Sequence, residues 1–410
     1  MKKNYQIFIS LVLLCVLIIF GLIWINTSLT AKFPNEKEFL PTWASLRTFI
    51  DYGIDPYSEQ ASNRTQFLFY KEVIQDNSDP LKLDQALPPL LVFFPLAFIN
   101  EYSIARIIYL ISLDLFLISI PIVLMNLLDW KPPLLLMISF IILVILGPIF
   151  IQALITHGPI IFVVSMILIG LLCLKFNLDE FAGVVFALVI FQPSLTALFL
   201  VFIGLWIVRN LRWRVIWGFL MTFSLLVLIS LALVPNWIIG FIKAFRIEEV
   251  YRNYLSTSLI LSEFSLGIGP KLALLLTGSV SILLLYEWLT LKKGEFHWFL
   301  WTNSLTICSF SLIGLKVLPN SSLILIIPFM YLISVASQRM TGKYKWTIQL
   351  SFLFLVFILG WGVFIYLIDQ NMIGTLNLVL NIISPIFLIT GLYWVRWWVI
   401  KYQRLQAVAK

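Results

Sequence analysis

The side chains best suited to chemistry gather in one stretch of the chain, residues 31–87. This stretch carries nine of the 20 acidic residues and six of the 28 basic residues, and strongly apolar segments flank it. Turn-forming residues interrupt it at Gly53-Ile54-Asp55-Pro56 and end it at Leu87-Pro88-Pro89. It is far longer than an ordinary connection between two helices. We therefore expect it to hold the carboxylates and bases of a functional site.

Composition indicates which elements position this site. Of the 410 residues, 61% are hydrophobic and only 12% are charged, against about 25% charged in soluble domains. A chain of this kind cannot cover its apolar surface in a soluble core, so we predict a polytopic, all-α membrane protein. The net charge of +8 does not indicate nucleic-acid binding, because the bases lie at the ends of apolar segments.

Apolar segments bounded by charges or turn residues predict about 10–12 transmembrane helices in a single membrane domain, residues 1–410. With twelve, the expected spans are residues 5–27, 88–99, 104–127, 133–155, 160–174, 181–208, 215–234, 266–290, 297–315, 321–337, 346–368 and 376–399. The second is short, so a tilt, a kink at Pro95 or only partial embedding stays open, and the gaps at residues 156–158 and 175–179 are alternatively re-entrant turns. The first resembles a signal peptide but is too long and lacks a clear cleavage site, so we interpret it as an uncleaved span. Residues 31–87 and 235–265 form the two long polar loops.

Basic residues predict the orientation of the chain in the membrane. The short segments on one side hold 15 Lys and Arg residues, and those on the other side hold four. The positive-inside rule then places both termini in the cytoplasm and both long loops on the extracytoplasmic face of the cell membrane.

The sequence lacks a phosphate-cradling glycine loop, a G-x-S-x-G nucleophile motif and zinc-ligand spacing. Cys15, Cys173 and Cys308 lie in apolar runs, and two histidines, His157 and His297, cannot form a histidine-rich metal site. We expect no metal and no cofactor. An enzyme that faces outward has no nucleotide sugar or ATP to use, so its activated group would come from a lipid carrier such as a polyprenyl-phosphate sugar.

Four segments of the chain carry a resemblance to a known family. They are Glu38 to Ser45, Gly53-Ile54-Asp55-Pro56-Tyr57, the Pro88-Pro89 to Ala97 region, and Phe191-Gln192-Pro193-Ser194-Leu195 before the basic turn Arg209 to Arg214. Together they resemble glycosyltransferase family 87. The resemblance implies a glycosyltransferase C fold and transfer of mannose or a related hexose from a polyprenyl phosphate. Three positions differ from the family: Glu38 replaces an Asp, Gln192 replaces a Lys, and residues 318–322 replace a histidine motif.

Glu38 is the candidate catalytic residue. It would act as the general base that deprotonates an acceptor hydroxyl, which then attacks the anomeric carbon in one inverting displacement. The alternative is a solvated loop acid. Asp55 either shapes the turn through backbone N–H groups or contacts substrate, and Tyr57 of the same turn is a further substrate-binding candidate. Arg47 either pairs with Asp51 on one helical face or faces the phosphate.

A departing lipid phosphate needs positive charge near it. The candidates for binding it on the outer face are Arg64, Arg252, Lys271 and Lys316, together with Asn320. For Lys271 and Lys316 the alternative is snorkelling to the headgroups. The segment 245–254 is a candidate interfacial helix. We interpret intramembrane Asp114 as a structural pairing residue and His157 as an interhelical or turn residue.

The sequence therefore predicts a membrane hexosyltransferase of the cell envelope. Its expected partners are a polyprenyl-phosphate sugar, a lipid or glycan acceptor and membrane lipids, and we expect no nucleic acid. Two alternatives stay open: a lipid or solute transporter or flippase, and a non-catalytic relative of the enzyme.

Overall fold

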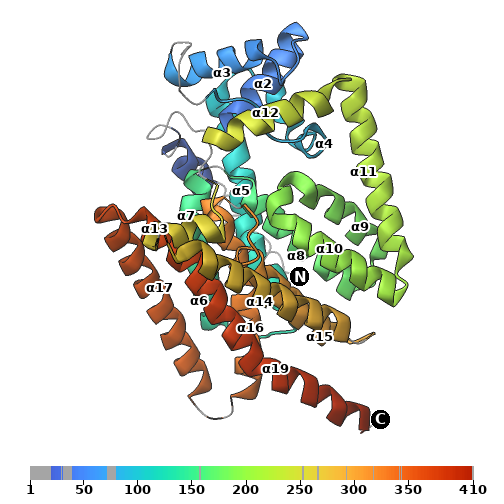
Figure 1. Ribbon diagram of the computed structural model, residues 1–410, viewed down its shortest axis with the longest axis vertical. Helices are drawn as coiled ribbons and strands as arrows, with labels where there is room; N and C mark the ends of the chain where they lie inside the picture. The colour runs from blue at the N-terminus through green and yellow to red at the C-terminus, as the bar shows by residue number, and fades with distance from the viewer. Residues whose placement is uncertain are drawn as a thin grey trace, which may run out of the picture. The chain divides into compact units, whose positions relative to one another are not determined.

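A computed structural model describes residues 20–28, 30, 39–71, 80–156, 158–251, 254–265, 267–291, 293–316, 318–340, 342 and 344–408. Within these residues the regular elements are helices, coloured along the chain in Figure 1. Seven of the helices are long and apolar enough to cross a membrane, or up to eight if the bent pair α6 (Leu134–Leu146) and α7 (Pro148–Ile155) is one span. The chain is thus an all-α, multi-pass membrane protein. Most of the first predicted span lies outside the described residues.

The second predicted span, residues 88–99, was wrong. This segment forms only α4 (Leu87–Leu90) and the 3₁₀ helix η1 (Phe94–Phe98), both far too short to cross a bilayer. Pro88, Pro89 and Pro95 explain the difference, because proline has no N–H to donate and its ring blocks the preceding helical turn. The long polar segment after the first predicted span therefore continues without an intervening span to α5 (Tyr102–Leu127).

Two other predicted spans are broken helices. The predicted span 133–155 bends by 42° between α6 and α7 at Gly147 and Pro148. The predicted span 181–208 is divided into α9 (Asp179–Leu188), η2 (Val189–Phe191) and α10 (Pro193–Asn210). The second break falls at Gln192-Pro193, where proline begins a new helix.

The chain divides into two compact units, and the first comprises residues 1–117, 154–158 and 230–248. In it α2 (Phe39–Tyr52) and α3 (Glu59–Tyr70) lie side by side, as the two blue helices of Figure 1 show. Gly53, with φ +66°, ends the first of these helices, and the Ser58 side chain caps the second by accepting from Ala61 N. Residues 39–70 of the predicted polar loop are therefore a folded helical pair. The unit also contains most of α12 (Trp237–Tyr251).

The second unit comprises residues 118–153, 159–229 and 249–410. Its remaining helices are α8 (Ile160–Lys175), α11 (Trp213–Leu233), α13 (Thr257–Phe264), α14 (Gly269–Thr290), α15 (Phe296–Ser309), η3 (Pro319–Leu325), α16 (Ile326–Arg339), α17 (Lys345–Asp369), α18 (Ile373–Leu378), the π-helical η4 (Val379–Ile383) and α19 (Ser384–Val408). Its core is α15, which is buried from Trp298 to Ser309 and packs on α19, α16, α10 and α14. By contrast α11, α14 and α17 leave most of their apolar residues uncovered, as lipid-facing helices do.

Candidate functional site

The first half of α2 is packed into its unit. Phe39, Leu40, Trp43, Ala44 and Leu46 are all buried. The predicted general base, Glu38, immediately precedes Phe39 and lies outside the described residues. The structure therefore describes the packing of the residues that follow Glu38. The role of Glu38 as a general base stays a prediction.

Aromatic contacts fix the beginning of α2 on the beginning of α5. The Phe39 ring stacks on Tyr109 with centroids 4.2 Å apart and lies 6.2 Å from the ring of Tyr102. The Trp43 ring is 5.3 Å from Tyr102, and its Nε1 donates to the Ile99 carbonyl at 3.3 Å. Large buried rings of this kind dominate packing energies and define the direction of a helix. These contacts determine where the chain enters α2.

Arg106 lies on α5 between those two tyrosines and is fully buried. Arg106 is one of the 15 Lys and Arg residues that the positive-inside rule counted on the cytoplasmic side, because it followed the predicted span 88–99. Since that segment does not form a spanning helix, Arg106 belongs to the end of α5 on which α2 packs. A buried guanidinium is costly unless acceptors compensate it, so Arg106 is a candidate functional cation that the sequence analysis missed. The three prolines within residues 88–95 were the signal that could have revealed it.

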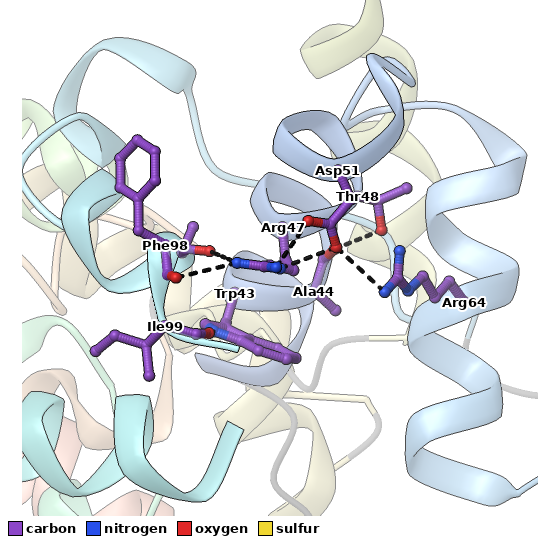
Figure 2. Close-up of polar contacts among 9 residues, drawn as sticks. Trp43, Ala44, Arg47, Thr48, Asp51, Arg64, Phe98 and Ile99 are labelled. Atoms are coloured by element: carbon purple, nitrogen blue, oxygen red, sulfur yellow. Dashed lines mark hydrogen bonds and ion pairs between the residues drawn. The ribbon is translucent and has the colours of Figure 1, made fainter. Parts of the chain in front are cut away.

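Arg47, Asp51 and Arg64 form the ion-pair cluster of Figure 2. The predicted pair is confirmed: Arg47 Nε and Nη2 lie 2.9 and 2.8 Å from the two Asp51 oxygens. Arg47 Nη1 donates to the carbonyls of Ala97 and Phe98 at 3.2 and 3.1 Å, so Arg47 joins α2 to η1. Arg64 Nη2 lies 3.6 Å from Asp51, and its guanidinium stands 5.0 Å above the Tyr52 ring. The Asp51 carboxylate thus brings together Arg47 and Arg64, which are both predicted phosphate-binding residues.

The predicted turn at Asp55 is confirmed. Its Oδ1 accepts from the backbone N–H of Tyr57 at 2.9 Å, and its carbonyl accepts from Ser58 N at 3.0 Å. The buried Tyr57 hydroxyl donates to the Gln85 carbonyl at 2.8 Å. Burial, with the nearby carboxylates of Asp55 and Asp84, raises the pKa of the Tyr57 phenol well above its ordinary value. Tyr57 is therefore a protonated hydrogen-bond donor that holds the loop, and it is not a base.

The other predicted phosphate-binding residues belong to the second unit. Lys271 is exposed in the first turn of α14, Lys316 is exposed just before η3, and Asn320 is half-buried within η3. Arg252 and His157 lie outside the described residues. The predicted interfacial helix over residues 245–254 corresponds to the last part of α12, which ends at Tyr251.

Two polar contacts join charged groups within apolar helices. Asp114 of α5 accepts from Asn26 Nδ2 at 2.6 Å, which confirms the predicted structural pairing of this carboxylate. In the second unit, buried Glu287 of α14 accepts from Tyr393 Oη at 3.0 Å and from Arg396 Nη2 at 3.1 Å. The sequence analysis missed this group, although an acid in the predicted span 266–290 and an Arg in the span 376–399 were visible.

Within the part of the chain that the structure describes, no three His, Cys, Asp or Glu side chains converge as metal ligands would. The site that remains is built from carboxylates, guanidinium groups and aromatic rings around α2 and the beginning of α5. No family model, no curated protein and no solved structure matches this chain.

Proposed function

We propose that the protein is a membrane glycosyltransferase. It transfers a hexose, with mannose favoured, from a polyprenyl phosphate to an acceptor on the extracytoplasmic face, and Glu38 is the general base. The sequence supports this proposal through the Glu38 segment and the Gly53 to Tyr57 turn. The contacts of α2 support it further.

The observation that carries the proposal is the junction between α2 and α5. Phe39, the residue that follows Glu38 in the sequence, is stacked on Tyr109 with ring centroids 4.2 Å apart. Fully buried Arg106 follows Tyr102 by one helical turn on the same helix. A carboxylate beside an aromatic and partly desolvated surface can be tuned toward the working pH.

The proposed reaction is a single displacement. Glu38 accepts the proton of an acceptor hydroxyl, and the hydroxyl oxygen forms a bond to the anomeric carbon. The bond from that carbon to the phosphate oxygen breaks, so the lipid phosphate leaves with the electron pair and the anomeric configuration inverts.

The experiment uses the full chain in lipid nanodiscs with radiolabelled polyprenyl-phosphate mannose and a membrane extract as the source of acceptor. Wild-type protein should transfer label, and Glu38→Gln should lower the rate about 100- to 10,000-fold, as loss of a general base does. Glu59→Gln is the matched control, because Glu59 is an exposed acid of the same loop. Unimpaired transfer by Glu38→Gln would remove Glu38 from the mechanism.

One observation favours transport as the second candidate. The predicted spans 321–337 and 376–399 include the 3₁₀ helix η3 and the π-helical η4. Broken or irregular membrane helices line the binding sites of many transporters. Vesicles that hold the protein and a fluorescent polyprenyl-phosphate sugar separate the two functions. Movement of the lipid between leaflets without transfer of sugar would show that the protein is a flippase and not a glycosyltransferase.

A further inference from the structure

Glu287, Tyr393 and Arg396 form a polar cluster between α14 and α19. The proposed reaction does not involve this cluster. The Glu287 carboxylate is 1% exposed and is held by Tyr393 and Arg396 through hydrogen bonds of 3.0 and 3.1 Å. The Arg396 side chain is 29% exposed, although its Nε is buried. Its guanidinium also stands 5.5 Å from the centroid of the Trp301 ring. Glu287 and Trp301 therefore orient a guanidinium that is partly exposed.

A groove of about 440 Å³ opens beside this guanidinium. Ser279, Ile282, Leu283, Tyr286 and Glu287 line it from α14, and Tyr393 and Arg396 line it from α19. The spacing of the α14 residues, at three and four positions, places them along about two turns of one helical face. The groove is thus apolar along its length and charged at one end.

Aromatic side chains indicate how the groove lies relative to the bilayer. Tyr286, Trp394 and Trp397 are 60%, 64% and 64% exposed, and all lie within one turn of Glu287 or Arg396 along their helices. Exposed Trp and Tyr rings are typical of the membrane–water interface. The guanidinium of Arg396 then lies at the depth of lipid phosphates, while Ile282 and Ser279 lie deeper in the hydrocarbon.

The charges at this end of α14 favour an anionic ligand. Arg209 Nη1 donates to the carbonyls of Trp288 and Leu289 at 3.3 and 3.1 Å, which places a second guanidinium here. Lys293 follows and is exposed. The three cations, Arg209, Lys293 and Arg396, exceed the two acids near them, buried Glu287 and half-buried Glu295.

We propose that this groove binds one anionic phospholipid of the bilayer, with its phosphate on Arg396 and an acyl chain along Ile282 and Leu283. Arginine forms strong charge-assisted hydrogen bonds with phosphate, and basic pockets between membrane helices are suited to anionic headgroups. The bound lipid joins α14 to α19 and is independent of glycosyl transfer.

The test measures lipid binding to the purified full chain in detergent by native mass spectrometry, together with the shift in Tm. Phosphatidylglycerol and phosphatidylcholine with identical acyl chains are compared, and polyprenyl monophosphate forms a third arm. We expect phosphatidylglycerol to bind at least about tenfold more tightly than phosphatidylcholine. Equal affinity for the two phospholipids would overturn the proposal, and tighter binding of polyprenyl monophosphate would reassign the groove to that lipid.

Two variants and one control locate the binding site. Ile282→Trp fills the groove from a position that is 72% exposed, and it should weaken phosphatidylglycerol binding about tenfold. Leu274→Trp is the matched control, because Leu274 is 76% exposed on the same helix and does not line the groove. Arg396→Lys keeps the charge beside Glu287 and should reduce the preference for the anionic lipid. If Ile282→Trp binds phosphatidylglycerol as tightly as wild type does, the lipid lies elsewhere and the proposal is wrong.

Discussion

At the scale of single residues, most of the polar side chains of the first loop act on the loop itself. Arg47 directs its Nε and Nη2 to Asp51 and its Nη1 to two carbonyls of η1, so most of its N–H donors are already used within the loop. Asp55 is likewise committed to the turn. These contacts stabilise the helical pair that carries Glu38 at its entrance, and they make Arg47 and Asp55 positioning residues in the proposed reaction.

The Tyr57 hydroxyl gives the prediction at this scale. Tyr57→Phe removes the hydrogen bond to the Gln85 carbonyl, which should lower the free energy of unfolding by about 1 kcal/mol near neutral pH. The pKa of the phenol is raised in the folded protein, so the hydroxyl contributes fully below about pH 10, its value in the unfolded chain, and the contribution falls as pH rises further. Thermal unfolding of wild type and of Tyr57→Phe between pH 7 and 11 measures the contribution of the hydroxyl to stability.

The two unfolding curves are compared as a difference, because other tyrosines and the lysines titrate equally in both proteins. The gap between wild type and Tyr57→Phe should narrow above about pH 10. A gap that stays constant to pH 11 would contradict the assignment of Tyr57 as a buried donor.

At the scale of elements, the first unit is held by close approach of helices. Gly240 of α12 lies against Tyr57, and a Cβ atom added to Gly240 would stand 2.8 Å from the Tyr57 Cβ and 3.0 Å from its Cγ. Both atoms belong to the rigid base of the side chain, so they cannot swing away. Only glycine permits this separation between α12 and the loop.

Gly240→Ala is the prediction at this scale. The added methyl group should overpack the contact between α12 and the turn at Tyr57 and lower the free energy of unfolding by about 1–3 kcal/mol. Gly204→Ala is the matched control, because Gly204 is also helical and a Cβ there meets nothing within 4 Å. In that variant alanine should be neutral or slightly stabilising. Equal Tm values for the two variants would show that the contact is not tight.

At the scale of the whole molecule, the structure changes the expected passage of the chain through the membrane. Because residues 88–99 form only α4 and η1, no spanning helix separates the loop helices from the beginning of α5. Arg47 and Trp43 instead tie α2 to the carbonyls of residues 97–99. Both ends of the segment 88–99 therefore lie on the same side of the bilayer.

Cysteine labelling tests this arrangement. Single cysteines at the exposed positions Asn63 and Asn100, in a chain whose three native cysteines are replaced, should react with a membrane-impermeant maleimide from the same side of sealed vesicles. Lys293→Cys in the same background reports whether the vesicles are sealed and uniformly oriented. Labelling of the two positions from opposite sides would restore residues 88–99 as a membrane span.

Composition and residue spacing were enough to predict the class of protein and the local contacts. Its apolar content required a multi-pass helical membrane protein, and the structure confirms this with seven to eight long apolar helices among the described residues. The spacing of Arg47 and Asp51 and the Asp-Pro-Tyr turn were also predicted correctly, because such contacts join residues two to four positions apart. Interactions of this range are dictated by local geometry.

Which apolar segments span the membrane, and which charges are buried, depended instead on packing between distant parts of the chain. Hydropathy counted residues 88–99 as a span, whereas their prolines and their contacts with α2 make them part of the loop. Arg106 became a buried cation, and Glu287 met Arg396, through contacts between helices far apart in the sequence. A hydropathy window averages the composition of neighbouring residues, so it cannot detect contacts between distant helices. The free-energy cost of burying a charge depends on those contacts, because they supply the groups that compensate it.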